Sequence, residues 1–151
     1  MQQIPLTQEL DFIRRYLEIE RLRYGEKLLV SLTSRPAAMD VLVPNIVLQP
    51  LVENAIKHGI SLRTSPGAVQ VTAQRAGDRL HIAITDDGPE GHSAPTPARK
   101  RQGIGLANSR AQLDKLYGND YRLEILKRPQ GGTVVSLELP WRRAPAVEIS
   151  S

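Results

Sequence analysis

The chain has 151 residues, of which 24% are charged and 40% hydrophobic, and its net charge is +4. This length predicts one domain with a substantial core, and no apolar run is long enough to span a membrane. Cysteine is absent, which excludes disulfides and cysteine metal sites and favours an intracellular setting.

The positive charge suggests anionic partners, among which nucleotide phosphates qualify as well as nucleic acid does. The chain has only one Trp, four Tyr and one Phe, too few to favour the stacking of exposed bases. Basic residues are dispersed, apart from the short runs at 99–101 and 142–143. Direct nucleic-acid binding is therefore disfavoured.

The first predicted element is a helix over residues 6–24, followed by a strand over 27–33. The apolar residues of this helix recur at helical spacing: Leu6, Leu10, Ile13 and Leu17. A second helix is predicted over residues 43–59, with Pro44 in its first turn. Pro50 predicts a kink or a break near Gln49, because proline does not suit a helix interior.

Two strands with period-two alternation are predicted next, over residues 69–75 and 79–86. Asp86 continues the apolar series of the second strand, which comprises Leu80, Ile82 and Ile84. We therefore expect Asp86 to face the core, where a carboxylate needs hydrogen-bond donors. Asp87 has the opposite parity and is expected to be exposed.

Residues 89–102 contain three prolines and no periodicity, which is typical of a lid or of disorder. A helix is predicted from about residue 106 to Tyr117, and strands over 121–127 and 132–139 complete the domain. Thr133 shares the parity of the inward-facing residues of the last strand, so it too is expected to face inward. Several helices beside a mostly antiparallel sheet predict a two-layer α/β sandwich.

The polar face of the second helix suggests one part of a binding site. Asn54, Lys57 and His58 are three and four residues apart, so they share a helix face. An amide oxygen suits Mg²⁺, and a lysine suits the phosphates that accompany it. The alternative is a solvated surface helix in which Glu53 pairs with Lys57.

Two further motifs have both a functional and a structural interpretation. Gly103 and Gly105 open a helix, where backbone N–H groups can approach a phosphate, but glycines also serve as hinges and caps. Asp86-Asp-Gly88 ends a strand; its carboxylate could accept a hydrogen bond from an amine such as that of adenine, or the motif is a simple turn. The chain contains no Walker A pattern.

In this order and spacing, the motifs resemble the ATP-binding domain shared by gyrase, Hsp90, histidine kinases and MutL. The segments Leu48-Gln-Pro-Leu-Val-Glu-Asn-Ala-Ile-Lys-His-Gly59 and Gly103-Ile-Gly-Leu-Ala-Asn-Ser-Arg110 are similar to LytS-type sensor histidine kinases of bacterial two-component systems. Residues 6–25 resemble the same subfamily. The resemblance covers roughly residues 5–140 and implies the Bergerat fold, a mixed and mostly antiparallel sheet covered on one face by helices.

The resemblance implies that ATP and Mg²⁺ are the ligands of this domain. Asn54 would bind Mg²⁺ and bridge it to the ATP phosphates, with Lys57 and His58 along the phosphate path. Asp86 would accept a hydrogen bond from the adenine amine, and Gly88 would let adenine approach closely.

The resemblance also assigns roles to the glycine-rich segment and to the last strand. The segment Gly103, Ile104, Gly105 and Leu106 would hinge the lid and present N–H groups to the phosphates. Thr133 would lie near the adenine.

Two departures from the family pattern affect the expected chemistry. Glu90 replaces a glycine where the lid begins, which stiffens that turn. Pro50 stands where relatives that hydrolyse ATP with water carry a glutamate, which argues against a gyrase- or MutL-like ATPase. Glu53 is a candidate for polarising the attacking group, although a pair with Lys57 is the simpler interpretation.

The resemblance predicts how the chain is divided and what surrounds it. Residues 1–25 would end the dimerisation and linker region, 26–140 would form the ATP-binding domain with its lid at 89–102, and 141–151 a flexible tail. The phosphoacceptor histidine would lie in a dimerisation region absent from this chain. We therefore expect ATP binding without self-phosphorylation, because His58, His81 and His92 lack a phosphoacceptor setting.

The expected partners of this domain are the histidine-containing dimerisation region and a response regulator. The full-length protein is expected to be a homodimer anchored in the inner membrane by an N-terminal sensor region, with this domain in the cytoplasm. Two alternatives remain on the same fold, a protein serine kinase and a nucleotide-binding regulatory module without catalysis.

Overall fold

The computed structural model describes residues 3–34, 41–44, 48–60, 65–88, 108–129 and 131–141. Its elements in chain order are β1 (Gln3–Pro5), α1 (Leu6–Tyr24), η1 (Gly25–Lys27), β2 (Leu28–Ser34), β3 (Leu42–Pro44), α2 (Leu48–His58), β4 (Gly67–Ala76), β5 (Arg79–Asp86), β6 (Arg122–Lys127) and β7 (Thr133–Pro140). Residues 108–117 are also helical. The predicted lid at 89–102 and the segment 103–106 lie outside the described residues.

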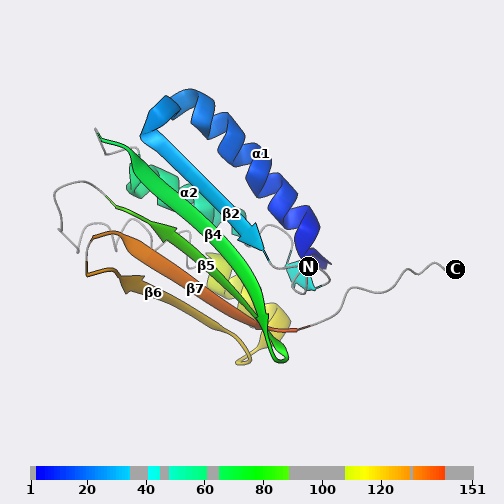
Figure 1. The fold of residues 1–151 in the computed structure, drawn as a ribbon. Helices are drawn as coiled ribbons and strands as arrows, with labels where there is room; N and C mark the ends of the chain where they lie inside the picture. Colours follow the sequence, from blue (N-terminus) through cyan, green and yellow to red (C-terminus); the bar gives the residue numbers. More distant parts are fainter. Residues whose placement is uncertain are drawn as a thin grey trace, which may run out of the picture.

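Five strands form the main sheet within the described residues, in the order β2-β4-β5-β7-β6. β2 pairs with β4 in parallel, and the other neighbouring strands pair antiparallel. In Figure 1 this sheet lies in front of α2 and of the yellow helix at 108–117, while α1 runs beside β2. The predicted mixed, mostly antiparallel sheet is confirmed.

The core lies between the helices and one face of this sheet. Alternate residues of β4 and β5 are buried there, including Val69, Val71, Ile82 and Ile84. The helices supply apolar residues to the same cluster: Leu6, Leu10, Ile13, Leu17, Leu48, Leu51, Val52, Ile56, Leu113 and Tyr117. Burial of these side chains on one side of the sheet produces the two-layer arrangement that the alternation predicted.

The helix predicted over residues 43–59 is wrong at its N-terminal end. Residues Leu42–Pro44 form β3, which pairs antiparallel with β1 at the start of the chain. α2 begins only at Leu48, so Pro50 lies in its first turn, where a missing N–H breaks no helical hydrogen bond. The expected kink near Gln49 is therefore replaced by a helix that starts there.

The N-terminus of α2 is capped by a carboxylate from α1. Oε2 of Glu9 accepts a hydrogen bond from the backbone N–H of Leu48 at 2.9 Å. Glu9 is only 1% exposed, because the two helices pack on each other. A negative charge at this end also interacts favourably with the helix dipole.

Among the described helices, none is long and apolar enough to cross a membrane.

Candidate functional site

The site is built around Asp86, the last residue of β5. Its Cα lies opposite Val69 of β4 on one side and Thr133 of β7 on the other. Asp86 is only 6% exposed, so the inward orientation predicted from strand parity is confirmed. The end of a strand thus carries a buried carboxylate on the face that the helices cover.

The end of α2 lies directly against this carboxylate through Gly59. A Cβ at Gly59 would stand 2.9 Å from Oδ1 of Asp86 and 2.6 Å from the carbonyl oxygen of Ala55. Only a glycine permits this approach. Gly59 was part of the motif in the sequence, but its contact with Asp86 depends on tertiary packing and was not predicted.

Burial raises the pKa of the Asp86 carboxyl to about 6. A hydrogen bond from the backbone of Gly88 opposes this rise, the charge of Asp87 adds to it, and the charge of Arg128 opposes it. Near neutral pH the group is mostly an ionised acceptor. A ligand that donates a hydrogen bond, such as an exocyclic amine, suits such a group.

Two glycines bring the β6–β7 turn against the backbone beyond Asp86. Gly88 has φ +75°, and a Cβ there would stand 2.7 Å from the Cα of Gly132. Gly132 has φ +91°, and its Cβ would collide with the carbonyl oxygen of Asp86. This segment has no room for side chains, because the two backbones lie against each other. The approach of adenine to Gly88 stays a prediction.

Asp87 lies on the opposite face and is only partly exposed. Its Oδ2 accepts a hydrogen bond from the N–H of Ala68 at 2.8 Å, and its Oδ1 accepts one from Nη1 of Arg128 at 3.2 Å. The expectation of an exposed side chain therefore missed two bonds. Both partners are distant in sequence, so strand parity alone could not reveal them.

Thr133 begins β7 and is partly buried. Because its Cα pairs with that of Asp86, the two side chains share one face of the sheet. The inward orientation of Thr133 agrees with its parity. Its contact with adenine stays a prediction.

The polar residues predicted on α2 lie in its C-terminal half, the end that reaches Asp86 through Gly59. Asn54 is partly buried and Lys57 is exposed, while the side chain of His58 lies outside the described residues. Oε2 of Glu53 accepts a hydrogen bond from Nε2 of Gln49 at 3.1 Å. This bond points Glu53 back along the helix, while its pairing with Lys57 stays a prediction.

The donor set fits Mg²⁺ only in the company of a nucleotide. Within the described ranges, no group of three or more His, Cys, Asp or Glu side chains could hold a metal ion. The amide of Asn54 offers a single oxygen, and Mg²⁺ in phosphate sites commonly takes one or two protein ligands plus phosphate oxygens and water. Residues 103–106, which were predicted to face the phosphates, lie outside the described residues.

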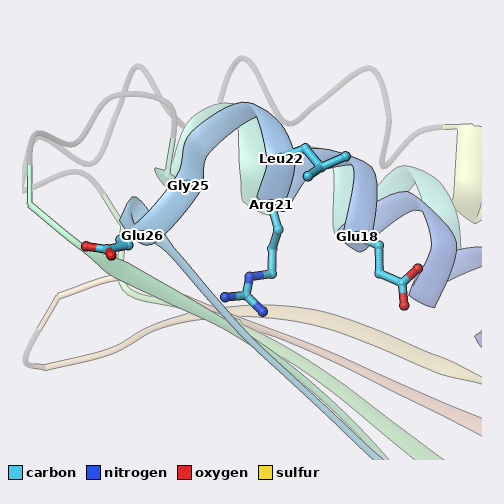
Figure 2. Close-up of a pocket in the computed structure, with 5 residues that line it drawn as sticks. All are labelled: Glu18, Arg21, Leu22, Gly25 and Glu26. Carbon is cyan, nitrogen blue, oxygen red and sulfur yellow. The ribbon is translucent and has the colours of Figure 1, made fainter.

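A separate open hollow lies at the C-terminal end of α1. Figure 2 shows the residues that line it, namely Glu18, Arg21, Leu22, Gly25 and Glu26. The side chain of Leu22 is strongly exposed beside charged groups of both signs. None of the predicted site residues lines this hollow, so it lies apart from the candidate site around Asp86.

Comparison of the sequence with known proteins finds one matching family and several similar sensor kinases. Residues 40–143 match the family described as histidine kinase-, DNA gyrase B-, and HSP90-like ATPase. The sensor histidine kinase BtsS of Escherichia coli K12 is 32% identical over 139 residues, covering 92% of this chain and 24% of the relative. The sensor protein LytS of Oceanobacillus iheyensis is 30% identical over 154 residues, covering 95% and 26%. The chain thus spans about a quarter of the length of these curated relatives.

Structural comparison finds similar folds at lower sequence identity. The catalytic domain of the histidine kinase ThkA superimposes with a TM-score of 0.70 at 16% identity, covering 93% of this chain and 95% of that chain. The same kinase, solved in complex with the response regulator TrrA, gives a TM-score of 0.68 at 16% identity, covering 93% and 42%. At 16% sequence identity, this structural similarity shows a shared fold and nothing further.

Proposed function

This chain belongs to the family of histidine kinase-, DNA gyrase B- and HSP90-like ATPases, and we propose that it is the ATP-binding catalytic domain of a sensor histidine kinase. In this role it transfers the γ-phosphoryl group of Mg-ATP to a histidine in the dimerisation region of the full-length protein. The similarity to BtsS and LytS over more than nine tenths of the chain supports this assignment.

The observation that carries the proposal is the environment of Asp86. A buried, ionisable acceptor stands at a strand end, and the backbone around it consists of Gly59, Gly88 and Gly132. We infer that Asp86 accepts a hydrogen bond from the exocyclic amine of adenine, and that Thr133 borders the same base. These glycines let the end of α2 and the β6–β7 turn pack directly against the strand end that carries the proposed adenine acceptor.

α2 supplies the groups proposed for the phosphates. Asn54 would hold Mg²⁺ through its amide oxygen, and Lys57 and His58 would serve the phosphates. Mg²⁺ neutralises charge on the phosphates when it is bound. The protein's own contribution would be to orient the triphosphate, and the predicted donors for this are the backbone N–H groups of Gly103, Ile104, Gly105 and Leu106.

The described residues supply no evident phosphoacceptor. Nε2 of His81 is hydrogen-bonded to Oγ of Ser136 at 2.9 Å across the β5–β7 pair, so this imidazole is engaged within the sheet. Glu53 stays a candidate for polarising the attacking group, and its Oε2 accepts a hydrogen bond from Nε2 of Gln49. We propose that the acceptor histidine comes from the dimerisation region and that a response regulator then receives the phosphoryl group.

Calorimetric titration with ATP and Mg²⁺ tests the binding site. The unmodified chain is expected to bind Mg-ATP. We expect Asp86→Asn to weaken binding at least tenfold, because an amide presents only one acceptor oxygen and an unwanted donor. Asn54→Ala is expected to weaken binding in the presence of Mg²⁺ far more than in its absence.

The matched control is Arg79→Met, at the opposite end of β5. Arg79 pairs with Asp120 and Glu138, so its loss perturbs the sheet without touching the proposed site. Absence of ATP binding by the unmodified chain would overturn the proposed function. Binding that survives both site substitutions would overturn the assignment of the residues.

Phosphoryl transfer is tested by adding a histidine-bearing dimerisation segment from a relative such as BtsS, with ATP labelled in its γ-phosphate. Label is expected on the histidine of the added segment and not on this chain. Label on a serine would indicate a serine kinase on the same fold, and binding without transfer would indicate a regulatory nucleotide-binding module.

We further propose that the full-length protein is a homodimer anchored in the inner membrane with this domain in the cytoplasm.

A further inference from the structure

The guanidinium of Arg128 connects the β6–β7 turn to the end of β5. Its Nη1 donates hydrogen bonds to the backbone carbonyl of Asp86 at 3.1 Å and to Oδ1 of Asp87 at 3.2 Å. Arg128 follows the last residue of β6, and β7 lies between β6 and β5 in the sheet. One side chain therefore reaches over the intervening strand to the two residues that end β5.

Asp87 is held from the other side by β4. Its Oδ2 accepts a hydrogen bond from the N–H of Ala68 at 2.8 Å, and its own N–H donates to the carbonyl of Ala68 at 3.3 Å. The Arg128–Asp87 pair thus ties together the β4 start, the β5 end and the β6–β7 turn. The pair is only partly exposed, so solvent screens it less than a surface pair.

We propose that Arg128 and Asp87 are positioning residues for nucleotide binding, which hold the end of β5 so that the Asp86 carboxylate meets the exocyclic amine of the base. This inference rests on the proposed function; Arg128 lies outside the motifs that suggested that function, and Asp87 receives a role that the motif did not assign to it. Neither side chain contacts the ligand. The backbone between Asp86 and Gly88 has little freedom to compensate, because Gly132 already lies against it.

The tolerance for error at Asp86 is small. Its carboxylate stands in contact with Gly59 of the α2 end, so a displaced β5 end changes the space between carboxylate and helix. A shift of about 1 Å in a bound geometry can cost on the order of a hundredfold in function. Loss of a supporting residue behind a ligand-binding group commonly costs about tenfold to a hundredfold.

The two members of the pair also act on Asp86 through their charges, in opposite directions. Arg128 lowers the pKa of the Asp86 carboxyl and Asp87 raises it. The described residues packed around this carboxyl are Gly59 just after α2, Val69 of β4 and Thr133 of β7, none of which titrates. Removing either charge breaks the same ion pair but shifts the ionisation of Asp86 the opposite way.

This opposition gives a pH-dependent readout beside the loss of affinity. The dissociation constant of Mg-ATP is measured by calorimetry from pH 5 to pH 8 for the unmodified chain, Arg128→Met, Arg128→Lys, Asp87→Asn and the control Arg79→Met. We expect the pH midpoint of binding to move upward in Arg128→Met and downward in Asp87→Asn. At pH 7.5 both variants are expected to bind about tenfold to a hundredfold more weakly.

The base amine provides a second readout. Each variant is also titrated with purine riboside triphosphate, which lacks the exocyclic amine. If the pair positions Asp86 for that amine, Arg128→Met weakens ATP binding much more than binding of this analogue. Arg128→Lys is expected to retain most of the affinity, because one ammonium group can reach both acceptors, and Arg79→Met is expected to bind as the unmodified chain does.

The outcomes separate this inference from the proposed function. No ATP binding by the unmodified chain would overturn both. ATP binding that is unchanged in Arg128→Met and Asp87→Asn, or equal losses for ATP and the analogue, would overturn the positioning role alone. If Arg128→Met fails to fold by circular dichroism, the losses of Asp87→Asn for ATP and for the analogue decide the question in the same way.

Discussion

At the scale of single residues, Asp86 makes folding stability depend on pH. Its pKa is raised from 3.8 to about 6 in the folded chain, so the folded state binds the proton more tightly than the unfolded state. The free energy of unfolding should therefore rise as pH falls from above 6 towards 4. Above pH 6 the buried charge costs about 3 kcal/mol, from about two units of raised pKa.

Asp86→Asn removes this titration. At pH 7.5 the variant is expected to be more stable than the unmodified chain by up to about 3 kcal/mol, while binding ATP more weakly. Urea unfolding from pH 4 to pH 8 measures both curves. The interpretation fails if the two proteins lose stability in parallel as pH rises through that window.

Gly132 is a second residue whose substitution has a clear expectation. A Cβ there would collide with the backbone of Asp86 and Asp87, and φ is +91°. Gly132→Ala is expected to cost more than about 3 kcal/mol, since backbone must move as well as adopt a strained angle. Thermal unfolding compares it with Gly77→Ala, where φ is +65° but nothing lies within 4 Å.

The Gly77 control isolates the angular strain, for which we expect about 1 kcal/mol. Equal losses in Gly77→Ala and Gly132→Ala would mean that the contact with Asp86 contributes nothing.

At the scale of elements, α1 and α2 are coupled through Glu9. Its buried carboxylate accepts the N–H of Leu48, the first residue of the helix that carries Asn54. Glu9→Ala is expected to lower the free energy of unfolding by about 1 to 3 kcal/mol, because a buried donor loses its partner. Glu9→Gln keeps an acceptor oxygen and should lose less.

Glu18→Ala is the matched control, since Glu18 lies on the exposed face of the same helix. Chemical denaturation measures all three variants, and the control should change stability by less than about 0.5 kcal/mol. If Glu9→Ala behaves as the control does, the cap does not hold α2.

Element identity was largely predictable, and pairing was not. The alternation in residues 69–75 and 79–86 predicted β4 and β5 together with the inward side of Asp86. β1 and β3 were missed, because each is three residues long and Pro44 suggested a helix start instead. A strand this short is recognised by the strand it pairs with. The partner of β3 is β1, which precedes α1 and is therefore distant in the sequence.

At the scale of the whole molecule, the motifs predicted the family and the layers, whereas the bonds around the site came only from the fold. The Arg128–Asp87 pair joins residues 41 positions apart. Gly59 showed as part of a helix motif, but its contact with Asp86 requires α2 to cross the sheet face. Charge and hydrophobic patterning report which side of an element is buried, and they do not report which distant group it meets there.

The parallel pairing of β2 with β4 has a consequence for the order in which the chain folds. The β4–β5 and β6–β7 pairs are hairpins with short turns, whereas β2 reaches β4 only after residues 35–66 have crossed over with α2. Closing such a long connection is entropically costly, so non-local pairs form later. Pulse-labelled hydrogen exchange during refolding tests this order. Amides hydrogen-bonded between β4 and β5 should be protected before amides hydrogen-bonded between β2 and β4. Simultaneous protection of the two sets would contradict the order. Because α2, the helix that carries Asn54, lies in this connection, it should pack on the sheet only when β2 pairs with β4. The ability to bind ligand should therefore appear at the final step of folding.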